Sequence, residues 1–195
     1  MLTKERLAAF TDAVLAIIMT ILVLELEKPE HVTWQGIWDL RVNYFAYALS
    51  FFWLGLMWFS HHNAWHKIKK INNSTVIYSL FMLFFASLFP YTTSIVAQNY
   101  DNSTAQVMYG VIVLLVSFSN MAISHSLNVA NHQKMFKALY DLSGTTVLLD
   151  LVIKVVGLIL SMTVYAPAML YAILLSLILL SVSNFASQLK KGSVK

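Results

Sequence analysis

The chain has 195 residues, of which 58% are hydrophobic and only 11% charged. Soluble domains carry about 25% charged residues, so this composition, with a mean hydropathy of +0.68, excludes an ordinary soluble enzyme. The formal net charge of +4 does not indicate a nucleic-acid-binding surface, because the basic residues lie at the ends of apolar segments.

Six segments are long and apolar enough to cross a membrane, since a spanning helix needs about 20 mostly apolar residues. They cover residues 6–26, 43–65, 75–97, 105–128, 146–165 and 168–189. The prediction is therefore an all-α membrane protein with six transmembrane helices in one domain, residues 1–195. Because helices and links use nearly the whole length, we expect its function to lie within the membrane.

The basic residues predict the orientation of these helices. One predicted side of the membrane carries Lys4, Arg6, Lys67, Lys69, Lys70, Lys134, Lys137, Lys190, Lys191 and Lys195. The other side carries only Lys28 and Arg41. The positive-inside rule then places both termini in the cytoplasm, with the protein in the plasma or inner membrane. The link 28–42, with Trp34 and Trp38, is short enough to form an interfacial helix.

The first segment combines an apolar stripe with two ionisable residues. At 100° per residue, one stripe contains Arg6, Phe10, Ala13, Ile17, Ile21 and Leu24. Asp12 lies about 140° away from Ile17 around the helix. Ionisable groups near the membrane need partners or water, so Arg6 and Asp12 are candidate functional or structural residues. The stripe by itself is equally typical of a lipid-facing or core surface.

Three motifs lie in order on the first three segments. They are Arg6 followed by Phe10-Thr11-Asp12, Trp58-Phe59-Ser60-His61, and Phe89-Pro90-Tyr91-Thr92. This set resembles the transmembrane protein 175 family of potassium channels, with Thr11 where the family motif has serine. Both side chains supply a hydroxyl group, so we expect the motif to persist.

The resemblance implies a function. It implies a homotetramer of six-helix subunits whose first helices line a central pore, through which K⁺ permeates passively. Ile17, Ile21 and Leu24 would form its narrow apolar rings, with Thr20 as a polar contributor. Such rings can gate by dewetting and penalise ions that hold their hydration shell tightly. The TVGYG filter sequence of ordinary potassium channels is absent from the chain.

The family motifs also imply a structural network between the first two helices. Its members would be Arg6, Phe10, Thr11, Asp12, Trp58 and His61. His61 would lie near the level of Arg6 and Asp12 if these helices are antiparallel neighbours. We expect these residues to tie helices together rather than to bind the permeant ion.

Three other groups of polar residues have simpler interpretations. Glu25 and Glu27 continue the first helix and form either an acidic vestibule that concentrates cations or merely solvated loop charges. His62 and His66 have the i, i+4 spacing of metal ligands but no evident third ligand, so we interpret them as structural. Asp150 and Lys154 have the same spacing, which predicts local neutralisation.

A secondary transporter or proton-coupled carrier is the alternative function. In such a carrier, Asp12 and His61 would act as a proton relay. The face with Ser117, Asn120 and Ser124 would form a polar path through the subunit. Carriers are typically built from internal repeats and broken helices, which we do not find in the sequence. We also find no pairing of nucleophile and base that would indicate an enzyme, although a purely structural role stays open. We expect no cofactor or metal, and as partners only other copies of the chain, lipid and monovalent cations.

Overall fold

The computed structural model describes residues 3–132 and 144–192, in which helices and loops occur and no strand. The helices are α1 (Lys4–Leu24), α2 (Trp34–Asp39), α3 (Arg41–Lys67), α4 (Asn73–Ser87), α5 (Phe89–Gln98), α6 (Ser103–Asn131), α8 (Gly144–Thr163) and α9 (Ala168–Gly192). Within the described ranges, six helical segments are long and apolar enough to span a membrane, with α4 and α5 counted together. The predicted all-α class with six spanning helices is therefore confirmed.

The third predicted helix, 75–97, is interrupted at Leu88, between α4 and α5. Pro90 lies in the first turn of α5. Proline lacks the N–H of a helix interior and its ring clashes with the carbonyl four residues earlier, whereas the first turn tolerates it. Ending α4 and restarting the helix avoids this clash. Pro167 likewise immediately precedes α9, near the predicted start of that helix.

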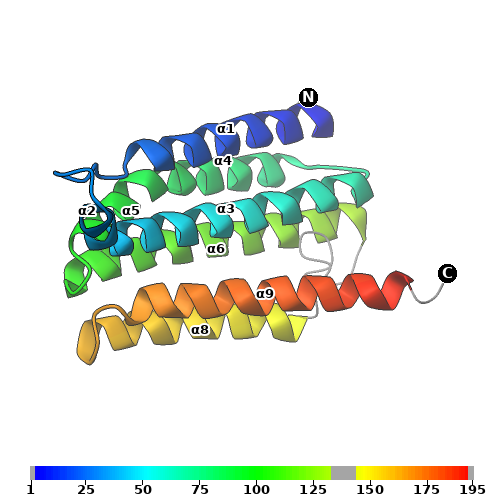
Figure 1. Ribbon diagram of the computed structural model, residues 1–195. Coiled ribbons are helices and arrows are strands. Elements are labelled where there is room, and N and C mark those ends of the chain that lie inside the picture. Colours follow the sequence, from blue (N-terminus) through cyan, green and yellow to red (C-terminus); the bar gives the residue numbers. More distant parts are fainter. Residues whose placement is uncertain (1–2, 133–143, 193–195) are drawn as a thin grey trace.

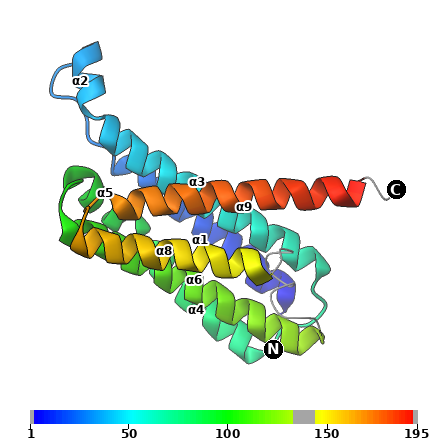
Figure 2. The ribbon, with the colours of Figure 1, turned by 90° about the horizontal axis from the view of Figure 1, so that it is seen from below.

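The spanning helices run alongside one another, with α1 at one side and the α8–α9 hairpin at the other (Figure 1). The short helix α2 projects beyond one end of the bundle (Figure 2). Its indole rings are exposed, at 88% for Trp34 and 64% for Trp38, and the Arg41 guanidinium lies 5.8 Å from the Trp38 ring centroid. A helix therefore forms within the link 28–42, as predicted, and its position at the membrane interface stays a prediction.

The beginning of α1 and the end of α3 lie at the same end of the bundle (Figure 1). We name this the basic end, after Lys4, Arg6, Lys67, Lys69 and Lys70. The Lys4 ammonium donates a hydrogen bond to the Ile68 carbonyl at 3.0 Å, which ties α1 to the end of α3. Lys134, Lys137 and Lys195 lie outside the described residues, as do the side chains of Lys190 and Lys191.

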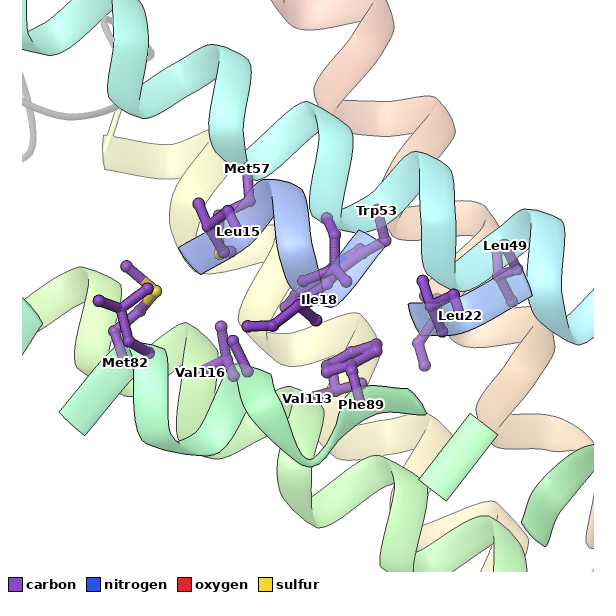
Figure 3. Packing of buried hydrophobic residues seen from close by; sticks show 14 of the residues in the cluster. Leu15, Ile18, Leu22, Leu49, Trp53, Met57, Met82, Phe89, Val113 and Val116 are labelled. Atoms are coloured by element: carbon purple, nitrogen blue, oxygen red, sulfur yellow. The ribbon is translucent and has the colours of Figure 1, made fainter. Parts of the chain in front are cut away.

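One face of α1 packs into the hydrophobic core. Leu15, Ile18 and Leu22 are almost fully buried, and they point toward side chains from α3, α4, α5 and α6 (Figure 3). Trp53 and Phe89 stack within this core, with their ring centroids 5.0 Å apart. Burying one face of α1 leaves large apolar side chains exposed on its other face.

The hairpin of α8 and α9 depends on a close approach at Gly157. A Cβ atom at this position would collide with the Cβ of Ala172 on α9. Small residues permit such helix contacts within membranes. We expect Gly157→Ala to cost about 1–3 kcal/mol, as overpacking does, and to lower the thermal unfolding midpoint of the purified protein. Gly55→Ala is the control, because its Cβ would meet only the Met19 methyl at 3.5 Å; equal midpoints for both variants would contradict the close approach.

Candidate functional site

The apolar stripe of α1 lies outside the bundle of the single subunit. The exposed fractions are 58% for Ile17, 37% for Ile21 and 77% for Leu24. Thr20 shares this exposed face, and its hydroxyl donates to the Ile17 carbonyl at 2.7 Å. The stripe is therefore available to lipid or to another subunit, as a pore-lining face must be.

The contacts between α1 and α3 include one link that joins two of the motif residues. The Trp58 indole N–H donates to the Asp12 carboxylate at 3.0 Å. Among the described residues, no ion pair joins Asp12 to Arg6. The Arg6 side chain is exposed. The link gives Asp12 a hydrogen-bonded partner on α3, which suits a residue that ties helices together.

His61 is fully buried and bonds to a different helix from the one predicted. Its Nε2 lies 2.8 Å from the Asn120 side-chain oxygen on α6. The single network expected around Arg6, Asp12 and His61 is thus divided into an Asp12–Trp58 link and a His61–Asn120 link. The reason is that Trp58 and His61 point about 60° apart around α3, so that Trp58 reaches α1 and His61 reaches α6.

The remaining motif and vestibule residues have distinct surroundings. Thr11 is buried, whereas Phe10 is 50% exposed on the same side as the apolar stripe. Glu25 is the C-cap residue of α1, and both Glu25 and Glu27 are exposed. Glu25 and Glu27 directly follow the stripe in the chain. They lie at the end of the bundle opposite the basic end.

We expect Asp12→Asn to weaken the attachment of α1 to α3. The charge-assisted hydrogen bond from Trp58 becomes a neutral one, at a cost of about 1 kcal/mol because the pair is partly exposed. The thermal stability and the assembly of the purified protein measure this loss. Asp39→Asn, which alters a hydrogen-bonded carboxylate on α2, is the control. Normal assembly and stability together with abolished ion flux would instead favour a relay role for Asp12.

The pair of Asp150 and Lys154 is more than the local neutralisation that its spacing predicted. The Lys154 ammonium donates to the Asp150 carboxylate at 2.7 Å and to the Ser117 hydroxyl at 3.1 Å, and it lies 5.3 Å from the Trp53 ring centroid. Ser176 hydrogen-bonds to the second carboxylate oxygen. The exposed fractions of Asp150 and Lys154 are 8% and 2%. The pair therefore joins α8 to α3, α6 and α9.

A small pocket of about 20 Å³ adjoins this pair. Its polar lining comes from Ser60, Ser117, Asn120, Asp150 and Lys154. The sequence signals for this cluster were the i, i+4 spacing of Asp150 and Lys154 and the polar face that contains Ser117 and Asn120. The spacing did not indicate which face of α8 would be buried.

His62 and His66 lie on the exposed surface of α3, with their Nε2 atoms 3.3 Å apart. Within the described part of the chain, no group of three or more potential metal-ligating side chains occurs. Among the described residues, His62 and His66 therefore have no third metal-ligating side chain beside them.

Comparison with known proteins shows a similarity to one family over part of the chain. Residues 6–90 match the family described as the endosomal/lysosomal potassium channel TMEM175. A protein named as a potassium channel from Chryseobacterium sp. is 37% identical over 114 residues, covering 58% of this chain and 59% of the relative. The endosomal/lysosomal proton channel TMEM175 of Gallus gallus is 27% identical over 118 residues, covering 54% of this chain and 24% of the relative. Each alignment thus spans less than two thirds of the relative's length.

A solved structure shares the fold. The crystal structure of a lysosomal potassium-selective channel TMEM175 homolog from Chamaesiphon minutus aligns with a TM-score of 0.67 and 22% identity. The alignment covers 90% of this chain and 97% of that one. The six spanning helices and these relatives make the chain a multi-pass membrane protein. Over the segment 6–90, the chain is thus similar to the TMEM175 family of channels.

Proposed function

We propose that this chain is the subunit of a homotetrameric, potassium-selective channel in which four α1 helices line a central pore. The observation that carries the proposal is the division of α1 into a buried face and an exposed apolar stripe. That division falls within the segment that matches a channel family. The stripe of one subunit does not enclose an ion path. In a cyclic tetramer, four copies of the stripe would form rings around the symmetry axis. The bacterial relative named as a potassium channel supports K⁺ as the permeant ion.

The rings would act through hydration. Ile17, Ile21 and Leu24 present branched aliphatic side chains, which offer an ion no replacement for its water shell. K⁺ holds its water less tightly than Na⁺, so a narrow apolar ring favours K⁺. Thr20 lies between the ring positions, and its hydroxyl oxygen can accept from water or approach the ion while its hydrogen bonds to the Ile17 carbonyl.

The ends of the pore would differ in charge. Glu25 and Glu27 continue α1 and are exposed, so four copies would place eight carboxylates around one entrance and attract cations. The basic end would face the cytoplasm according to the positive-inside rule, with both termini on that side of the plasma or inner membrane. Permeation would be passive, with no cofactor.

Cysteine labelling tests the arrangement of the pore, because the chain contains no cysteine. We expect small water-soluble thiol reagents to react with cysteines introduced at Ile17 or Leu24. Ile18 and Leu22 are the matched controls, since both are buried against other helices and should react much more slowly. Crosslinked species should end at four subunits. A crosslinking ladder that ends at two, or equal reaction at all four positions, would refute the tetrameric α1 pore.

The carrier remains the second candidate, and one observation favours it. His61 bonds to Asn120, and Ser117 and Ser124 share the buried face of α6, so a polar face does lie inside the subunit. A carrier would give a saturable flux coupled to a gradient, whereas the channel would give an ohmic current.

A further inference from the structure

One face of α6 carries a row of buried polar side chains that the pore does not use. Its members are Ser117, Asn120, Ser124 and Asn128, whose exposed fractions are 7%, 2%, 0% and 5%. Spacings of three and four residues place them on one side of the helix. The row runs from the middle of α6 toward the basic end.

Helix α3 supplies the facing side of this row. Both helices run toward the basic end, and two contacts fix their register. His61 bonds to Asn120 at 2.8 Å, and the Asn131 side chain accepts from the backbone N–H groups of Lys69 and Lys70, at 3.0 Å each. Trp65 lies one helical turn beyond His61, as Ser124 lies one turn beyond Asn120. We name the six side chains of His61, Trp65 and the α6 row the polar column.

Several atoms of the polar column have no hydrogen-bond partner within the described part of the chain. They are His61 Nδ1, Trp65 Nε1, Ser124 Oγ and both side-chain polar atoms of Asn128. Each is buried, and buried polar groups in folded proteins are bonded either to protein or to ordered water. Five such atoms along one helix pair have the donor and acceptor character that a row of water molecules needs.

The inner end of the column adjoins the pocket beside Asp150 and Lys154, because Ser117 and Asn120 line that pocket. Beyond Ser117, the next residue on the same face of α6 is Val113, which is fully buried in the apolar core. Trp53 and Phe89 stack in that core, and the hydroxyl of Tyr109 is already bonded to Ser50. The polar lining therefore ends at this layer.

We propose that each subunit holds a dead-ended file of ordered water molecules along the polar column, separate from the central pore. The file enters at the basic end and hydrates the Asp150–Lys154 pair, and the Val113, Trp53 and Phe89 layer stops it there. Water at this depth keeps the ion pair solvated without opening a second conduction path through the subunit.

Hydroxyl-radical footprinting by X-ray radiolysis of the full-length protein, read by mass spectrometry, tests this file, because radicals form from water beside the labelled side chain. We expect buried Trp65 to be oxidised about tenfold faster than buried Tyr109, since only Trp65 has an unpaired polar atom on the column. Trp34, which is exposed at 88%, gives the rate for full contact with water.

A pair of α6 variants separates bound water from surface exposure. Asn128→Leu removes two unpaired polar atoms at nearly constant volume and should lower the Trp65 oxidation rate several-fold. Ser126→Ala alters a buried α6 serine that already bonds to Asn72 and Thr75, and it should leave that rate unchanged. If Asn128→Leu does not fold, Ser124→Ala replaces it. A Trp65 rate as low as that of Tyr109, or a rate that Asn128→Leu or Ser124→Ala leaves unchanged, would overturn the proposal.

Discussion

Replacing Ile17 by asparagine is expected to raise the ion current and to weaken the discrimination between K⁺ and Na⁺. Ile17 lies on the exposed stripe of α1 and is one of the three positions that the family resemblance assigns to narrow apolar rings. An amide side chain hydrates the ring and gives a partly dehydrated ion new ligands. A loss of about tenfold in the permeability ratio would correspond to about 1.4 kcal/mol, and reversal potentials under bi-ionic conditions measure it.

The matched control is Ile178→Asn. Ile178 is an exposed isoleucine on α9, with an exposed fraction of 50%, close to the 58% of Ile17. The same substitution there introduces the same polarity without altering α1. If the Ile17→Asn protein has unchanged current and unchanged selectivity, Ile17 does not line the conducting path.

Replacing Lys154 by methionine is expected to destabilise the fold by about 3–5 kcal/mol, because it leaves the Asp150 carboxylate buried without its cation. The pair is almost fully buried and links four helices. Thermal unfolding of the purified protein in detergent, followed by tryptophan fluorescence, should show a large fall in the midpoint.

The double variant Asp150→Leu with Lys154→Met separates loss of the ion pair from loss of side-chain volume. Replacing both charges by apolar groups of similar volume is often neutral or stabilising, so the double variant should be more stable than Lys154→Met alone. A Lys154→Met protein as stable as the unmodified protein would mean that protonation or nearby water fully offsets the loss of the Lys154 charge beside Asp150.

The sequence predicted the features that depend on local pattern. Backbone groups in lipid must be satisfied within the segment, so long apolar stretches form helices, and the six spans follow from hydropathy alone. The period of 3.6 residues likewise predicted that Ile17, Ile21 and Leu24 share one side of the first helix, but only the structure showed that this side is exposed. Pro90 was a local sign of the interruption at Leu88. One helix over 75–97 was nevertheless predicted, because the whole segment is long and apolar.

The features that the sequence did not predict depend on which helices become neighbours. His61 and Asn120 are separated by 59 positions, so no local pattern pairs them. The i, i+4 spacing of Asp150 and Lys154 is the same on a solvated face as on a buried one, and only the contacts of the two side chains with α3, α6 and α9 show which it is. The pore role of the α1 stripe stays a prediction, because a pore requires the contacts between subunits.

The most direct measurement of the proposed function is the current carried by the purified, unmodified protein in a planar lipid bilayer. K⁺, Na⁺ and proton gradients are imposed in turn, and the reversal potential is recorded for each. We expect an ohmic current whose reversal potential follows the K⁺ gradient, and an Ile17→Asn current that follows it less closely. A saturable flux that requires a proton gradient, or a reversal potential that does not change with the K⁺ gradient, would contradict the proposal of a potassium channel.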